Sequence, residues 1–147
     1  MASHQPILTA GEVNELFDRV FPQLHFGGRT YAVEEVGPLA ARVRMEFHER
    51  HVRPGGTISG PSMMALADLA LYAAILAQIG PVALTVTTSL NFNFLRKPDQ
   101  RALIGDCRLL KLGRRLAVGE VSIFSEGSAD VVCHATGTYS IPDRRSN

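Results

Sequence analysis

One segment, Ser62 to Ile79, constrains the fold more than any other part of the chain, because it is apolar almost without interruption. Pro61 before it and Gly80-Pro81 after it are typical of the start and the stop of a helix. A helix that is apolar all round is buried on most sides. A membrane span is disfavoured, since the segment is barely long enough and carries the carboxylate of Asp68 near its middle. We therefore expect a buried core helix from about Pro61 to Gln78 and no membrane association.

The segments around this helix show the period of two that indicates strands. From Leu39 to Phe47, apolar residues alternate mostly with charged ones, which predicts an antiparallel strand with one wet face. Further strands are expected at Tyr31 to Val36, Leu84 to Phe94, Ala102 to Leu112, Leu116 to Ser125 and Val131 to Ile141. A capping box of Thr9 and Glu12 begins a first helix, which the apolar spacing extends from about Ala10 to Val20.

The predicted order is a helix, two strands, the long helix and four strands, joined by short loops. An antiparallel sheet of about six strands has an apolar face to cover, and only one long apolar helix is available to cover it. We therefore expect an α+β fold in which the sheet curls around that helix, the hotdog architecture. The 147 residues leave room for one core, so a single domain spanning residues 1–147 is expected.

The composition disfavours several classes of protein. Hydrophobic residues make up 46% and charged residues 20%, as in an ordinary soluble globular protein. The formal net charge of +1 argues against a nucleic-acid binder, which needs a marked basic excess. Cys107 and Cys133 lie far apart in apolar runs, so we expect reduced core thiols in a cytoplasmic protein. The N-terminal residues lack the pattern of a signal peptide, and the sequence from His48 to His51 lacks the H-E-x-x-H spacing of a metal site.

Asp68 is the only charged residue between Arg53 and Arg96. An uncompensated carboxylate in a buried helix costs several kcal/mol. Carboxylates in apolar settings tend to be functional, which favours a catalytic role. The alternative is an aspartate on a minor exposed stripe, or one bonded to a hydroxyl such as that of Ser62, Ser89 or a threonine.

A glycine-rich loop, His51 to Pro61, leads into the helix. Backbone N–H groups at a helix N-terminus bind negative charge. Because Pro61 has no N–H, Gly60 would supply the leading donor, which suits an oxyanion hole. Taken alone, however, the loop is better explained by a plain tight turn with Ser59 as N-cap and Pro61 at the first helical position.

Four short sequences lie in the order and spacing of one known family. They are Ser59-Gly60-Pro61 with Leu66-Ala67-Asp68, Asn91 to Pro98, Gly113 to Ala117, and Ala135 to Tyr139. Together they resemble the hotdog acyl-CoA thioesterases of the phenylacetate-degradation (PaaI-like) type. The signature of that family is His-Gly-Gly followed by Leu-Ala-Asp, and its next strand ends in Phe-Leu-Arg-Pro. The resemblance covers roughly Tyr31 to Ile141.

The resemblance implies hydrolysis of an acyl-CoA thioester to free acid and CoA, at a site shared by two chains. The carboxylate that matches Asp68 is the general base or the nucleophile of such enzymes. The N–H that matches Gly60 polarises the thioester carbonyl, and a hydroxyl that matches Thr87 assists. No separate cofactor is implied, because CoA is part of the substrate.

The spacing of Gly60 and Asp68 supports a shared site independently. The two residues are eight positions apart on one helix, which corresponds to roughly 12 Å along its axis. That is too far for both to act on one carbonyl group. We therefore expect a homodimer with two sites, and pairing of two dimers into a homotetramer is left open.

The chain departs from the family pattern at three positions. Ser59 stands where histidine is usual, Pro61 replaces the second glycine, and Arg53 stands where an amide side chain is common. Arg53 would position the water or the carbonyl, or bind a carboxylate on the acyl group. A solvated loop arginine is an equal alternative. These departures leave the acyl group open and bear on whether activity is altered.

Coenzyme A carries phosphates and needs cations. Arg96 and Lys97 end one strand and Arg114 and Arg115 open another, so we expect the four to converge at one rim of the sheet. Four ordinary surface charges are an equal alternative. The acyl tunnel is expected along the helix, with these lining residues as candidates for medium aliphatic or aromatic chains: Met63, Met64 and Tyr72.

Two other functions remain as alternatives. A hotdog enoyl-CoA hydratase or dehydratase pairs an aspartate with a nearby histidine, and no histidine lies between His51 and His134. This alternative is therefore weaker. A non-catalytic acyl-CoA-binding protein would agree with the departures at Ser59 and Arg53.

Overall fold

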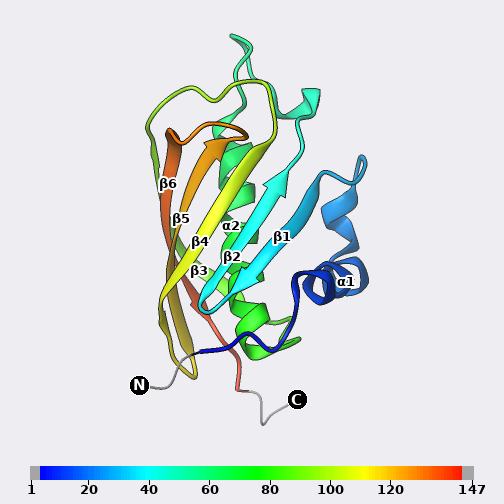
Figure 1. Ribbon diagram of the computed structural model, residues 1–147, viewed down its shortest axis with the longest axis vertical. Helices are drawn as coiled ribbons and strands as arrows, with labels where there is room; N and C mark the ends of the chain where they lie inside the picture. Colours follow the sequence, from blue (N-terminus) through cyan, green and yellow to red (C-terminus); the bar gives the residue numbers. More distant parts are fainter. Residues whose placement is uncertain (1–3, 144–147) are drawn as a thin grey trace.

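The computed structural model describes residues 4–143, which form one antiparallel sheet wrapped around one long helix (Figure 1). The helices are α1 (Ala10–Val20) and α2 (Gly60–Ile79), with short 3-10 turns η1 (Pro22–His25) and η2 (Glu49–His51). The strands are β1 (Tyr31–Gly37), β2 (Ala40–Met45), β3 (Val86–Phe94), β4 (Leu103–Leu112), β5 (Leu116–Ser125) and β6 (Val131–Ser140). Their order in the sheet is β1-β2-β4-β5-β6-β3. This architecture confirms the expected α+β hotdog fold, including the extra N-terminal helix.

Helix α2 lies against the concave face of the sheet and forms the core of the molecule. It is the one helix among residues 4–143 that is long and apolar enough to cross a membrane. Most of its side chains, however, are enclosed by the sheet, and Leu66, Leu71 and Ile75 are fully buried. Cys107 and Cys133 are buried free thiols that line the same core. Burial raises the pKa of Cys133 to about 11.

Two paired glycines let α2 approach the sheet closely. Gly119 in β5 and Gly137 in β6 lie opposite each other, and the side chain of Leu71 lies over both. A Cβ atom on Gly119 would lie 2.7 Å from Leu71 Cδ2, and one on Gly137 would lie 2.6 Å from Leu71 Cδ1. Atoms cannot approach this closely unless the helix or the sheet moves. Leu71 therefore fits against the sheet only because Gly119 and Gly137 have no side chains.

The two edge strands of the sheet, β1 and β3, differ in whether another element hydrogen-bonds to their outer side. At the β1 edge, Asn14 of α1 takes the place of a neighbouring strand. Its Nδ2 donates to the carbonyl of Val33 at 2.9 Å, and its Oδ1 accepts from the N–H of Val33 at 2.8 Å. At the other edge, no element among residues 4–143 pairs with the outer side of β3. The unpaired backbone groups of this nine-residue strand favour pairing with a strand of another chain.

A β-bulge in β3 decides which of its side chains face α2. The register of β3 against β6 shifts between Thr87 and Ser89. Before the shift, Thr87 lies opposite Tyr139, and after it, Leu90 lies opposite Gly137. In a regular strand, Thr87 and Leu90 would face opposite sides of the sheet. The extra residue turns both toward the helix.

Candidate active site

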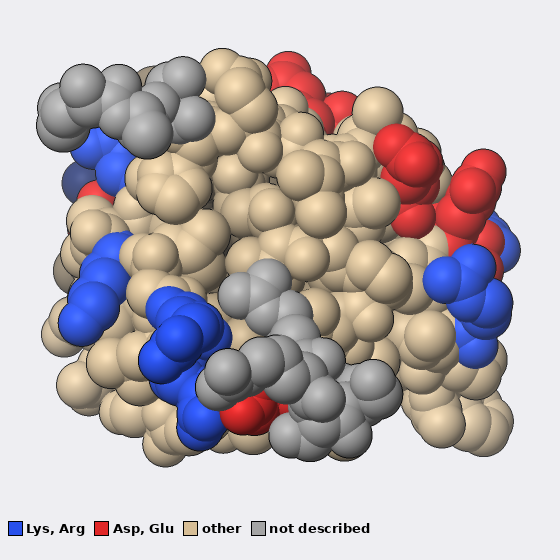
Figure 2. Space-filling view, turned by 90° about the horizontal axis from the view of Figure 1, so that it is seen from below, with Lys and Arg blue, Asp and Glu red and all other residues tan. Residues whose placement is uncertain are grey.

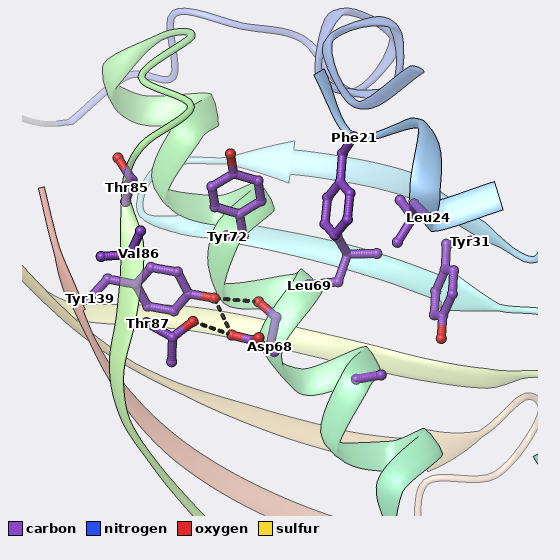
Figure 3. Close-up of a pocket in the computed structure, with 11 residues that line it drawn as sticks. Phe21, Leu24, Tyr31, Asp68, Leu69, Tyr72, Thr85, Val86, Thr87 and Tyr139 are labelled. Carbon is purple, nitrogen blue, oxygen red and sulfur yellow. Dashed lines mark hydrogen bonds between the residues drawn. The ribbon is translucent and has the colours of Figure 1, made fainter. Parts of the chain in front are cut away.

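Asp68 lies in the middle of α2, and its side chain is held by two hydroxyl groups (Figure 3). Thr87 Oγ1 donates to Asp68 Oδ1 at 2.7 Å. The hydroxyl of Tyr139 donates to the same Oδ1 and lies 2.8 Å from the main-chain oxygen of Asp68. Within residues 4–143, Asp68 Oδ2 has no hydrogen-bond partner. One carboxylate oxygen is therefore fixed by donors, and the other is free to take part in chemistry.

Tyr139 was not among the residues that the sequence singled out. Its ring is 2% exposed in β6 and stacks on Tyr72 with ring centroids 6.4 Å apart. Burial, followed by the charge of Asp68, raises the pKa of Tyr139, so its hydroxyl stays protonated and acts as a donor. A signal was present in the sequence. Tyr139 shares the strand face of Ala135 and Gly137, and a hydroxyl on a buried face needs a partner.

A cavity of about 450 Å³ opens beside Asp68. Its wall is largely apolar and is formed by Phe21, Leu24, Tyr31, Ala65, Leu69, Tyr72 and Val86, together with Thr85, Thr87 and Tyr139. Figure 3 shows Phe21, Leu24 and Tyr31 on the side of the cavity away from β3, and the ring of Tyr72 between them and Thr85. An apolar cavity with a few convergent polar groups is typical of a small-molecule site.

The N-terminus of α2 borders a second cavity, of about 410 Å³. Gly60 lies in its wall, and the N–H of Gly60 has no acceptor among the described residues. Ser59 is the N-cap and accepts from the N–H of Ser62 at 3.3 Å, as the tight-turn alternative expects, but Gly60 rather than Pro61 is the first helical residue. The cavity also brings together three cations, Arg53, Arg96 and Lys97.

A family model described as "Thioesterase superfamily" matches residues 55–132, which include Gly60, Asp68 and Thr87. The chain belongs to the thioesterase superfamily. It is therefore an enzyme that hydrolyses thioesters, and the resemblance found in the sequence is confirmed at the level of the family.

Solved structures and a further relative support the same family. A protein assigned as a thioesterase in Silicibacter sp. TM1040 is 43% identical, with a TM-score of 0.86 over 95% of this chain and 96% of the other. A variant of the phenylacetic acid degradation protein PaaI of Thermus thermophilus is 27% identical, with a TM-score of 0.70 over 82% and 99% of the two chains. A protein assigned as an esterase in Saccharolobus solfataricus is 29% identical over 91% and 86% of the two chains.

In this thioesterase the four expected phosphate-binding cations do not converge within one chain. Arg96 and Lys97 follow the last residue of β3, whereas Arg114 and Arg115 lie in the β4–β5 turn at the opposite end (Figure 1). Both β3 and β5 run antiparallel to β6, so both begin where β6 finishes. Figure 2 looks at that end of the molecule, where two basic patches lie on the left and acidic side chains, with a further basic patch beside them, lie on the right. The expectation of a single rim is wrong for one chain, because it did not take into account that β3 and β5 run in the same direction.

The remaining expected residues divide between the two cavities. Tyr72 lines the cavity of Asp68, Met63 lines that of Gly60, and Met64 lines neither. Gly60 and Asp68 thus belong to different cavities of one chain of the thioesterase. Among residues 4–143, no group of histidine, cysteine, aspartate or glutamate side chains is arranged to hold a metal ion.

Proposed function

We propose that this thioesterase hydrolyses acyl-CoA as a dimer, with Asp68 of one subunit and the N–H of the partner subunit's Gly60 acting on the same thioester. The observation that carries the proposal is the hydroxyl-held carboxylate of Asp68 at an apolar cavity. Asp68 Oδ2 takes a proton from the attacking water, or attacks the carbonyl carbon itself. The Gly60 N–H, at the positive end of α2, stabilises the developing oxyanion.

The open edge of β3 supports the dimer. Three of the large hydrophobic side chains on or beside this strand are exposed: Leu84, Val86 and Phe94, at 69%, 50% and 47%. The other edge of the sheet is already covered by α1 through Asn14. A two-fold axis at the middle of β3 joins two copies through the same edge and leaves no free edge that would propagate a polymer.

Antiparallel pairing of two β3 strands also completes the site. It places the Phe94 end of one strand beside the Val86 end of the other. Gly60 packs against the Phe94 ring, since a Cβ at this position would lie 3.4 Å from Phe94 Cζ. Asp68 is bonded to Thr87, next to Val86. The pairing therefore brings Gly60 of each subunit toward Asp68 of its partner, which a single helix cannot do.

Subunit complementation tests the shared site. Gly60→Pro removes the N–H at a helix position that tolerates proline, and Asp68→Asn removes the proton acceptor. Each variant alone is expected to be inactive in a thiol-release assay with acyl-CoA. After co-refolding, half of the dimers are mixed and carry one complete site, so about one quarter of the wild-type activity is expected to return.

The control for this experiment is Gly60→Ala, which keeps the N–H and adds only a methyl group. It is expected to keep most of the activity, because the added Cβ would make ordinary contacts with the Phe94 ring at 3.4 Å or more. No recovery on mixing two folded, dimeric variants would show that each site is built from one chain.

The cationic cavity around Gly60 suits the phosphates of coenzyme A. None of Arg53, Arg96 and Lys97 forms an ion pair with a carboxylate among residues 4–143. Three unpaired cations beside a helix N-terminus attract an anion. In the proposed dimer, the partner's β4–β5 turn lies at the same end of the joined sheet as this cavity, beyond the partner's β3 and β6. Arg114 of the partner subunit would therefore be an outer contact for the phosphates.

Replacing Arg96 and Lys97 by alanine is expected to raise KM for acyl-CoA about 10-fold and to leave kcat nearly unchanged, because phosphate binding acts equally in the ground and transition states. The effect should fade at high salt, where exposed charges are screened. Arg19→Ala, which removes an exposed charge on α1, serves as the control. An unchanged KM in the double variant would place the nucleotide elsewhere.

A further inference from the structure

We infer that the segment joining α1 to β1 sets the acyl specificity of this enzyme, and that the acyl group is uncharged and of medium length. The inference rests on the proposed acyl-CoA hydrolysis and names the substrate class of that site. Phe21 and Leu24, from the end of α1 and from η1, form the wall of the Asp68 cavity that faces Val86 (Figure 3). This wall lies outside residues 55–132, the part of the chain that the family model matches.

The wall is held in place on both sides. Val13, Leu16 and Phe17 of α1 are buried in the core. The ring of Phe17 stacks on Tyr72 with centroids 5.5 Å apart, and the Tyr72 hydroxyl donates to the carbonyl of Ala83 at 2.8 Å. The stacked rings of Phe17 and Tyr72 therefore join α1 to α2. This contact fixes the position of the wall that Phe21 and Leu24 form.

Asp18 ties η1 back onto α1. It lies 2.8 Å from His25 Nε2 and accepts from Arg29 Nη1 at 3.0 Å. The hydrogen bond of Arg29, followed by that of His25, lowers the pKa of Asp18, so these bonds favour its charged form. Because η1 is bonded to α1 in this way, Leu24 presents a defined surface to the cavity.

The lining of the cavity indicates the chemistry of the acyl group. It contains no lysine or arginine, and its one charged side chain is the carboxylate of Asp68. The hydroxyls of Tyr72, Thr87 and Tyr139 are already engaged in hydrogen bonds. Thr85 Oγ1 is buried without a partner among the described residues, and it is an uncharged group. A carboxylate on the acyl chain would meet a like charge and no cation. The acyl group is therefore uncharged.

The size of the cavity indicates the length of the chain. Its volume is about 450 Å³. If a methylene group is taken to fill roughly the volume of a water molecule, ~30 Å³, the space accepts a chain of about 8 to 12 carbons once the thioester and water are placed beside Asp68. Longer chains would meet the wall formed by Phe21 and Leu24.

Leu24→Trp tests the inference, because the larger side chain shortens the cavity from the wall side. With a panel of butyryl-, octanoyl-, dodecanoyl- and succinyl-CoA, the wild type is expected to prefer octanoyl- and dodecanoyl-CoA and to reject succinyl-CoA. In Leu24→Trp, kcat/KM for dodecanoyl-CoA is expected to fall roughly 10- to 100-fold, and that for butyryl-CoA to stay within about 2-fold. The matched control is Gln23→Trp, on the exposed side of η1, which should keep the wild-type profile.

Phe21→Ala is a second test of the wall, which remains available if Leu24→Trp does not fold. It lengthens the cavity and is expected to raise kcat/KM for palmitoyl-CoA relative to octanoyl-CoA about 10-fold. A folded Leu24→Trp that slows all acyl-CoAs equally, an unchanged chain-length profile in Phe21→Ala, or a wild-type preference for succinyl-CoA would overturn this inference alone. A wild type that releases thiol from none of the acyl-CoAs would overturn the proposed function, and this inference with it.

Discussion

Asp68→Asn is expected to lower kcat for acyl-CoA hydrolysis by roughly 10³-fold or more, because an amide neither accepts a proton from water nor attacks a carbonyl carbon. Asparagine has nearly the size of aspartate. Its amide oxygen still accepts from Thr87 and Tyr139, which donate to Asp68 Oδ1 in the wild type. The fold and the dimer should therefore survive, so that the loss reports on chemistry rather than on stability.

The assay measures released CoA thiol, and thermal unfolding is followed in parallel. Thr87→Val serves as a milder comparison, because it removes one of the two hydroxyl groups that donate to Asp68 and keeps the carboxylate itself. We expect it to lower kcat by only about 10-fold, with KM nearly unchanged. Turnover of folded Asp68→Asn close to that of the wild type would remove Asp68 from the mechanism and leave the family assignment intact.

Gly119→Ala is expected to destabilise the fold by roughly 3 kcal/mol, although it adds a single methyl group. The new Cβ would lie 2.7 Å from Leu71 Cδ2, 3.0 Å from Leu109 Cδ2 and 3.1 Å from the carbonyl oxygen of Arg108. Leu71 is fully buried and is bounded on its other side by Gly137, so it cannot turn away. The carbonyl belongs to the paired strand β4 and is fixed by the sheet.

Urea unfolding at constant protein concentration measures this loss, since the stability of a dimer depends on concentration. Gly11→Ala is the matched control. It lies on the exposed side of α1, where a Cβ would meet nothing closer than 3.9 Å, and alanine should stabilise the helix by up to about 1 kcal/mol. Adding Leu71→Ala to Gly119→Ala should cost less than the sum of the single changes, because the shortest of the three contacts, the one with Leu71, is gone. Simple additivity would show that Gly119 does not set the distance between helix and sheet.

Local sequence signals account for most of the fold. The capping box of Thr9 and Glu12 and the apolar spacing after it placed α1 at its observed bounds, Ala10–Val20. The uninterrupted apolar run with its flanking glycine and proline predicted α2 to within about two residues. Each signal is a property of neighbours in the chain, and the need to bury α2 then determined the order of layers.

The site was less accessible from the sequence. The isolation of Asp68 in an apolar helix indicated a special role, but only the register of the strands identified the groups that hold it. Thr87 faces Asp68 because of a bulge that interrupts the alternation of β3. The hydroxyl of Tyr139 comes from a strand 71 positions later in the chain. The positions of Arg96 and Arg114 at opposite ends also follow from strand direction.

The sequence by itself determined which segments are helix and strand, that α2 is the core, and that Asp68 is exceptional within it. These depend on the periodicity of neighbouring residues and on the cost of burying a charge. Only the tertiary structure decided which hydroxyls hold Asp68, which edge of the sheet stays open, and which residues wall the cavity. These depend on register, bulges and helix docking, which are contacts between distant parts of the chain that no local pattern encodes.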